Sequence, residues 1–128
     1  MRILTYFSLL VCGYGVFING LDLLLFLEAP DDYSMVYLIG PDNEHWQFKS
    51  AGNFLKWKTV LVILFAFHTA ISLSYLIRPG FYVGKFRRSA LLCTFITTLF
   101  AVVWEIRSHL IWIRSGYDHY PGFDPYIL

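Results

Sequence analysis

The residues from Ala90 to Ile113 read ALLCTFITTLFAVVWEIRSHLIWI, and this stretch decides the fold. It is apolar over a length that can cross a bilayer, because about 20 helical residues at about 1.5 Å each span the hydrocarbon. Inside that length it carries Glu105, Arg107 and His109. Ionisable groups are expensive in hydrocarbon and usually face protein or a wet cavity. We therefore expect the rest of the chain to surround and orient this helix.

The composition indicates an integral membrane protein. The chain has 128 residues, of which 57% are hydrophobic and 15% are charged, whereas a soluble domain is about 45–50% apolar and about 25% charged. The apolar residues fall into three blocks of spanning length, at about 3–27, 57–77 and 90–113. We predict an all-α membrane protein, with residues 1–128 forming a single domain of three transmembrane helices.

The loops between the spans differ in charge and predict the topology. Loop 28–56 is acidic and aromatic, whereas the short loop 78–89 carries basic residues and no acid. By the positive-inside rule, the basic loop and the N-terminus lie on the inner side, the matrix if the membrane is mitochondrial. The acidic loop and the C-terminus then lie outside. The basic residues are Arg78, Lys85, Arg87 and Arg88.

The same four basic residues form a candidate site for a lipid headgroup. Clusters of Lys and Arg beside a membrane span attract anionic phospholipids, such as cardiolipin in a mitochondrial membrane. The alternative is that these residues only set the topology. The sequence leaves both interpretations open.

Loop 28–56 and tail 114–128 are both expected to be ordered by docking on neighbouring chains. Pro30 ends the first helix, and residues 33–39 have a strand-like composition. A loop of this length without regular structure is uncommon unless it is functional, disordered or docked. The tail combines proline, glycine and aromatic residues, so we expect it to be extended rather than helical.

Small side chains recur at steps of three or four residues and predict faces where helices pack closely. Such a face occurs in each predicted span. The residues are Ser8, Cys12, Gly15 and Asn19 in the first span and Ala66, Ala70 and Ser74 in the second. In the third span, Ala90, Thr94, Thr97, Ala101 and Ser108 share one helical stripe with Glu105 and His109.

Four ionisable residues near the outer face are expected to form an intramembrane polar network. Glu105 and His109 are four residues apart on one helix and can meet directly. Arg107 points about 200° away from Glu105, so it could reach headgroups or pair with Asp22 of the first span. A proton relay that includes His68 is the alternative. These groups form no continuous line, so the structural network is the simpler interpretation.

His68 lies near the middle of the second span and suggests a haem or chlorophyll ligand. A haem held by two histidines would need His109 at the same depth, but helical rise separates the two by about 10–15 Å. We therefore prefer a neutral histidine hydrogen-bonded to a neighbouring helix, and predict no cofactor within this chain. A ligand shared with another chain stays open. Cys12 and Cys93 have no second cysteine at metal-ligand spacing, so neither a disulfide nor a metal site is expected.

The function predicted from these features is structural. The sequence contains no Gly-rich phosphate loop and no His-x-x-x-His motif, so we expect no catalysis by this chain alone and no nucleic-acid partner. We expect an accessory subunit of a hetero-oligomeric membrane complex. Respiratory-chain and ATP-synthase assemblies of the mitochondrial inner membrane are favoured by association only. The alternatives are a homo-oligomeric channel or transporter lined by Glu105 and His109, and a cofactor-ligating subunit that uses His68.

Overall fold

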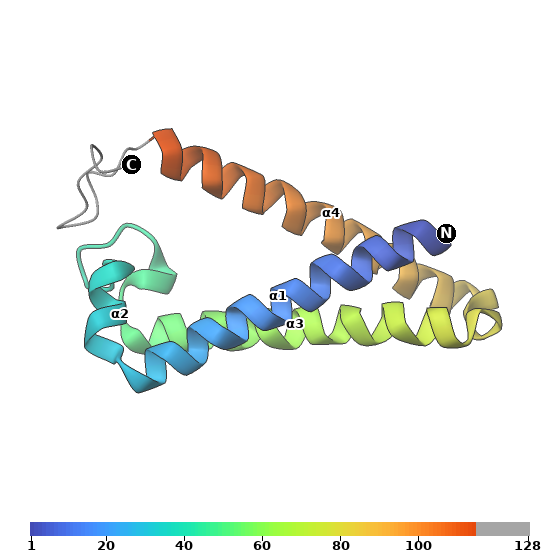
Figure 1. Cartoon of the computed structure of the whole chain (residues 1–128), viewed down its shortest axis with the longest axis horizontal. Coiled ribbons are helices and arrows are strands. Elements are labelled where there is room, and N and C mark those ends of the chain that lie inside the picture. Colours follow the sequence, from blue (N-terminus) through green and yellow to red (C-terminus); the bar gives the residue numbers. More distant parts are fainter. Residues whose placement is uncertain (115–128) are drawn as a thin grey trace.

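A computed structural model of the chain describes residues 1–114, apart from the side chains of residues 33, 36 and 108–114. Its three long helices are α1 (Arg2–Glu28), α3 (Ala51–Ile77) and α4 (Lys85–Arg114) (Figure 1). The short helix α2 (Pro30–Val36) and the 3-10 turns η1 (Trp46–Phe48) and η2 (Pro79–Val83) lie between them. Each long helix is long and apolar enough to span a membrane. The prediction of an all-α chain with three helices that are long and apolar enough to span a membrane is therefore confirmed for the described residues.

The long helices alternate in direction along the chain: in Figure 1, α1 runs from right to left, α3 from left to right and α4 from right to left. Helices α1 and α3 pack against each other along most of their length, whereas α4 approaches them with its first half and then diverges. The N-terminus lies at the same end as η2. Helix α2 and the loop that follows it lie at the opposite end. The two ends therefore carry different loops, as the alternation of spans requires.

Helices α3 and α4 begin before the apolar spans that predicted them. Helix α3 starts at Ala51, inside the predicted loop 28–56, where the Ser50 hydroxyl accepts a hydrogen bond of 3.1 Å from the backbone N–H of Asn53. Such an N-cap satisfies one of the free N–H groups of the first turn. Helix α4 starts at Lys85, inside the predicted basic loop 78–89. Hydropathy locates the span, but capping locates the helix end.

The segment after Pro30 is helical, although its composition resembles that of a strand. Helix α1 ends at Glu28, as expected from the proline, and Pro30 is also the first residue of α2. Proline is pre-organised for the first helical position. Asp31 and Asp32 lie in the first turn, where carboxylates interact favourably with the helix dipole. These local start signals outweigh the β-propensity of the residues that follow.

The small-residue face predicted on α1 is the face that packs. Ser8, Cys12, Gly15 and Asn19 are all buried. Gly15 is required for this packing, because a Cβ atom there would lie 2.7 Å from ring carbons of Phe65 on α3. The prediction for α1 is therefore confirmed.

The faces predicted on α3 and α4 are rotated in the structure. On α3, Ala66 and Ala70 are exposed, whereas His68, Ile71 and Ser72 are buried. On α4, the buried residues are Leu91, Thr94 and Thr98, so the predicted face shares only Thr94 with them. Alanine is compatible with lipid, but an imidazole needs a polar partner. The burial of His68 therefore explains the rotation of α3.

Candidate functional site: polar clusters between the helices

The bundle contains a neutral cluster of five buried polar or sulfur-bearing side chains, which come from all three long helices. Each of them is no more than 5% exposed. No member of the cluster carries a formal charge when the histidine is neutral. The members are Cys12 of α1, His68 and Ser72 of α3, and Thr94 and Thr98 of α4.

His68 is the largest member of the neutral cluster and joins α3 to α4. Its Nδ1 atom lies 2.9 Å from the Thr94 hydroxyl oxygen. That hydroxyl donates a hydrogen bond of 3.0 Å to the carbonyl of Ala90, so its oxygen is free to accept from the imidazole. We assign the imidazole proton to Nδ1, which leaves Nε2 as an acceptor. His68 thus bonds to a neighbouring helix, as the preferred interpretation predicted, and the cofactor-ligand alternative stays a prediction.

The other members of the neutral cluster make weaker contacts. The Cys12 sulfur lies 3.6 Å from the Thr98 hydroxyl, which donates a hydrogen bond of 2.8 Å to the carbonyl of Thr94. The Ser72 hydroxyl is fully buried and has no hydrogen-bond partner among the described residues. Hydrogen bonds between membrane helices contribute about 0.6 kcal/mol on average. The neutral cluster therefore orients the helices more than it stabilises them.

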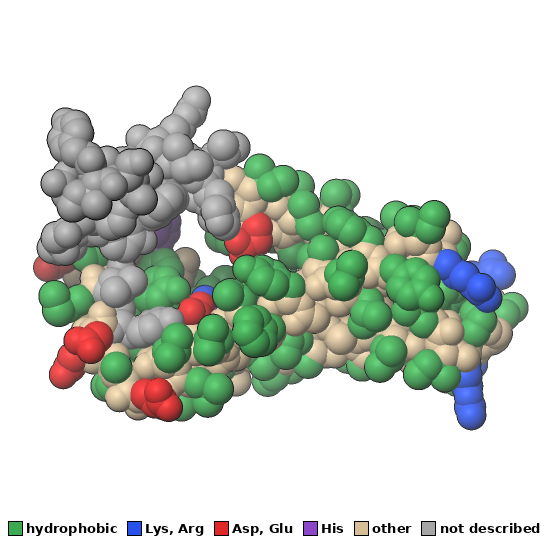
Figure 2. All heavy atoms as spheres, in the orientation of Figure 1, with side chains coloured by type: hydrophobic (Ala, Val, Ile, Leu, Met, Phe, Trp, Pro, Cys, Tyr) green, Lys and Arg blue, Asp and Glu red, His purple; other side chains and the backbone are tan. Residues whose placement is uncertain are grey.

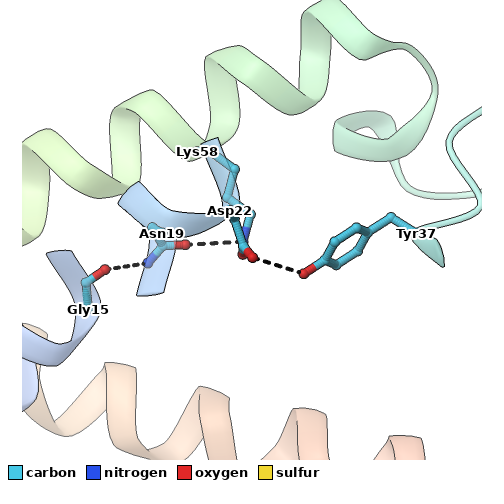
Figure 3. Close-up of polar contacts among 5 residues, drawn as sticks. All are labelled: Gly15, Asn19, Asp22, Tyr37 and Lys58. Carbon is cyan, nitrogen blue, oxygen red and sulfur yellow. Dashed lines mark hydrogen bonds and ion pairs between the residues drawn. The ribbon is translucent and has the colours of Figure 1, made fainter. Parts of the chain in front are cut away.

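A second, charged cluster joins α1, α3 and the loop after α2 (Figure 3). The Lys58 ammonium lies 2.7 Å from a carboxylate oxygen of Asp22, and it donates a hydrogen bond of 3.1 Å to the side-chain oxygen of Asn19. The Tyr37 hydroxyl donates to the other Asp22 oxygen over 3.3 Å, and the Asn19 amide donates to the Gly15 carbonyl over 2.8 Å. Both side chains of the ion pair are only 14% exposed. The pair is thus largely removed from solvent.

Aromatic rings pack around this ion pair. Phe54, which is fully buried, has its ring centroid 5.0 Å from that of Phe26, 5.2 Å from that of Tyr37 and 6.2 Å from that of Phe48. The Lys58 ammonium lies 5.7 Å from the Phe54 centroid and 5.9 Å from the Tyr37 centroid, which are cation–π distances. The rings dock part of the predicted loop 28–56 on the chain's own helices. Docking of that loop on a partner stays a prediction.

The structure shows a partner for one member of the network predicted near the outer face. Asp22 forms an ion pair with Lys58, whereas the sequence analysis offered Arg107 as its partner, with contact to headgroups as the alternative for Arg107. Glu105 and Arg107 both lie on the exposed second half of α4. The His109 side chain lies outside the described residues, so its contact with Glu105 stays a prediction. Lys58 lies at the start of the predicted span 57–77 and was not among the predicted members of the network. The missed signal was that the carboxylate of Asp22 needs a cation at its own depth.

The basic residues of the predicted headgroup site lie at the end opposite to the charged cluster, and Figure 2 shows basic side chains at that end. Arg78 caps the C-terminus of α3, and Lys85, Arg87 and Arg88 lie in the first turn of α4. All four are exposed. They therefore form a charged surface at the end of the bundle.

Neither a metal-binding group in the described part of the chain nor similarity to a known protein indicates the function of this chain. The described residues contain no group of three or more His, Cys, Asp or Glu side chains that could hold a metal ion. The chain matches no family model, no curated protein and no solved structure. A functional proposal therefore rests on burial, charge and helix packing.

Proposed function

We propose that this chain is an accessory, structural subunit of a multi-subunit membrane complex, where its helices brace neighbouring membrane subunits. One observation carries the proposal: the second half of α4, as far as its side chains are described (residues 99–107), is uncovered. Leu91, Thr94 and Thr98 are buried in the first half of this helix. From Leu99 to Arg107, no residue is buried. Figure 1 shows α4 leaving the α1–α3 pair over this second half.

The chemistry of this uncovered half favours protein rather than lipid as its neighbour. It presents five apolar side chains that are 46–68% exposed, and the rings of Phe100 and Trp104 stack with centroids 6.3 Å apart. It also presents Arg107, whose charge is costly to expose to hydrocarbon. A neighbouring helix could cover the apolar residues and also shield this charge from lipid. The five apolar residues are Leu99, Phe100, Val103, Trp104 and Ile106.

The buried polar groups also support a bracing role, because they hold the helices of this chain together. The His68 imidazole bonds to Thr94, and the Asp22 carboxylate bonds to Lys58 and Tyr37. These contacts join one helix to another or join a helix to the loop. They fix the shape of the subunit, and we assign no catalytic role to them.

The proposed location is the mitochondrial inner membrane, in a respiratory-chain or ATP-synthase assembly. This step is associational, since such assemblies contain many small membrane chains. The proposed orientation places the basic end in the matrix and the acidic loop outside. It is supported by the separation of charge between the two ends: Figure 2 shows acidic side chains at the α2 end and basic side chains at the other.

The test is extraction of the native membrane with a mild detergent, followed by a native gel and mass spectrometry of the band that contains this chain. We expect migration with a much larger complex. The variant Phe100→Ala/Trp104→Ala should strongly reduce the fraction of this chain that migrates with the larger complex. The matched control is Phe7→Ala/Phe17→Ala on α1, where the two rings are 48% and 64% exposed. Equal losses in the two variants, or migration as a small homo-oligomer, would contradict the proposal.

The homo-oligomeric channel or transporter is the second candidate, because Glu105 lies on the uncovered half of α4. In that case Glu105 would face a symmetry axis and water. Migration as a small homo-oligomer would favour this candidate, and cross-linking between Cys residues introduced at position 105 of different copies would test it. The third candidate, a cofactor ligated by His68, predicts an absorbance band of the purified assembly that His68→Ala removes.

A further inference from the structure

The turn between α3 and α4 combines positive charge with exposed apolar side chains. Arg78, Lys85, Arg87 and Arg88 are exposed there, and Arg2 lies at the same end of the bundle (Figure 1). The sequence has no Asp or Glu in residues 1–21 or 45–104, which include all the elements at this end. Among the described residues, no carboxylate therefore lies at this end to neutralise the positive charge of the turn.

Buried contacts hold the turn in place, so the backbone that carries its basic side chains has a fixed position. Tyr82 of η2 is 9% exposed and packs with Ile71 of α3 and Leu91 of α4. The Tyr82 hydroxyl bonds to the Ser74 hydroxyl, which itself donates to the Ile71 carbonyl over 2.9 Å. Its ring lies edge-on to that of Tyr75, with centroids 5.7 Å apart. These contacts tie η2 to both long helices.

Arg87 is the cation whose position the turn fixes. Its guanidinium carbon lies 3.5 Å from the centroid of the Phe81 ring, and its Nη1 atom donates a hydrogen bond of 2.9 Å to the Phe81 carbonyl. A guanidinium has five N–H donors in a planar fork that matches a phosphate, and this contact uses one of them. Arg87 is exposed, so other donors can reach a ligand.

The start of α4 adds to the preference for an anion. The N-terminus of a helix carries a partial positive charge, and cations are favoured at the opposite end. The first turn of α4 has no acidic residue and includes Lys85, Arg87 and Arg88. Positive side chains at the positive end of a helix dipole are unfavourable, and an anion bound beside them would offset this repulsion. This effect supports the site formed by the cations and does not define it alone.

Apolar side chains beside the cations determine the kind of anion. Phe81 is 52% exposed, Val83 63%, Ile77 69% and Phe86 88%. A soluble anion would leave these side chains in water, whereas a phospholipid would cover them with its acyl chains while its phosphate met the cations. We propose that the α3–α4 turn is a binding site for an anionic phospholipid, with Arg87 stacked on Phe81 as the main phosphate contact. This proposal does not depend on the accessory-subunit proposal.

The experiment is native mass spectrometry of the purified full-length chain in detergent, titrated with phosphatidylglycerol or with phosphatidylcholine. Membrane topology plays no part in detergent, so residues that only set topology would give equal affinity for the two lipids. We expect tighter binding of phosphatidylglycerol. Since a basic residue near an anionic membrane surface contributes about 1 kcal/mol, the loss of one specific contact should weaken binding about fivefold.

Two variants with the same change of residue separate a defined site from a diffuse charge. Arg87→Lys keeps the charge but removes the planar fork that stacks on Phe81 and matches a phosphate, so it should weaken phosphatidylglycerol binding by more than about twofold. Arg88→Lys makes the same change in the same turn, where the structure gives the side chain no such contact, and should change binding less than about twofold. Equal affinity for the two lipids, or equal effects of the two variants, would overturn the proposal. Full competition by inorganic phosphate would also overturn it, because the ligand would then be phosphate rather than a lipid.

Discussion

The neutral cluster and the charged cluster are both largely buried and both include residues of α1 and α3, but they differ in what their loss would expose. In the neutral cluster, His68 and Thr94 share a hydrogen bond between uncharged groups. In the charged cluster, Asp22 and Lys58 form an ion pair that is 14% exposed on each side. Losing one partner of a buried ion pair leaves an uncompensated charge, at about 3–5 kcal/mol, whereas interhelical hydrogen bonds in membranes average about 0.6 kcal/mol. Charge, more than burial, therefore determines how much stability is lost when a member of each cluster is replaced.

The largest effect is expected for Lys58→Met. The change keeps most of the side-chain volume but removes the cation that balances the Asp22 carboxylate, while neutral donors such as the Tyr37 hydroxyl remain. We expect the free energy of unfolding to fall by about 3 kcal/mol, at the low end of the range because the pair is partly exposed. The measurement is an SDS titration in mixed micelles followed by tryptophan fluorescence. Lys56→Met is the matched control, since Lys56 is exposed on the same helix. A similar loss in the control would contradict the role of charge.

Removing both charges at once sharpens the comparison. The double variant Asp22→Asn/Lys58→Met loses both charges of the pair, and the amide oxygen introduced in place of the carboxylate would still accept from Tyr37. We expect it to be more stable than Lys58→Met alone, with about half of the lost free energy recovered, because replacing a buried pair by neutral groups is often nearly neutral. The same SDS titration measures it. If the two single changes were additive in the double variant, the ion pair would not be the source of the effect.

Gly15 tests the packing that holds the clusters together, since it lies on α1 between Cys12 and Asn19. An added Cβ would meet the Phe65 ring at 2.7 Å, so the ring or the helix must move. We expect Gly15→Ala to lower the free energy of unfolding by about 1–3 kcal/mol, the usual range for overpacking. Gly20→Ala is the control, because a Cβ there has no atom within 4 Å. A loss of the same size at both positions would point to helix backbone effects instead.

Within the neutral cluster, Thr94→Val removes the hydroxyl that His68 contacts while it preserves the shape of the side chain. The Nδ1–H group of His68 would then be buried without that partner. We expect a loss of about 0.6–1.7 kcal/mol, from the average to the maximum for hydrogen bonds between membrane helices. Thr97→Val, one turn along and only partly buried, should change less. A loss as large as that of Lys58→Met would remove the distinction between the two clusters.

The sequence predicted features that a single helix encodes and missed those that depend on two. The spans follow from hydropathy, and the packing face of α1 follows from an unbroken series from Ser8 to Asn19. Within this chain, α3 packs by a different face from the predicted one. Ala66 and Ala70 fit lipid as well as protein, and only the match between His68 and Thr94 distinguishes the two faces.

The charged cluster shows the same limit. Asp22 was recognised as an intramembrane ionisable residue, but its partner was not. Lys58 flanks the apolar span, and flanking lysines usually extend to the interface. In the structure its ammonium instead reaches Asp22 and Asn19 under the rings of Phe54 and Tyr37. Which cation meets a carboxylate depends on how α1 and α3 are aligned and on how the loop after α2 folds back. The spacing of residues within one helix predicts neither of these.

The smallest effect is expected for Ser72→Ala, and its contrast with Ser74→Ala is the finest test of the neutral cluster. The Ser72 hydroxyl is fully buried without a hydrogen-bond partner among the described residues, so its removal should leave stability unchanged or raise it slightly. The Ser74 hydroxyl donates to the Ile71 carbonyl over 2.9 Å and bonds to Tyr82, so its removal should lower the free energy of unfolding by about 0.6 kcal/mol or more. Both changes remove one oxygen from the same helix and are measured by the same SDS titration. If Ser72→Ala lowered the free energy of unfolding as much as Ser74→Ala, the Ser72 hydroxyl would have to be hydrogen-bonded in the folded protein. The neutral cluster would then contribute more to stability than the contacts of His68 with Thr94 and of Cys12 with Thr98 imply.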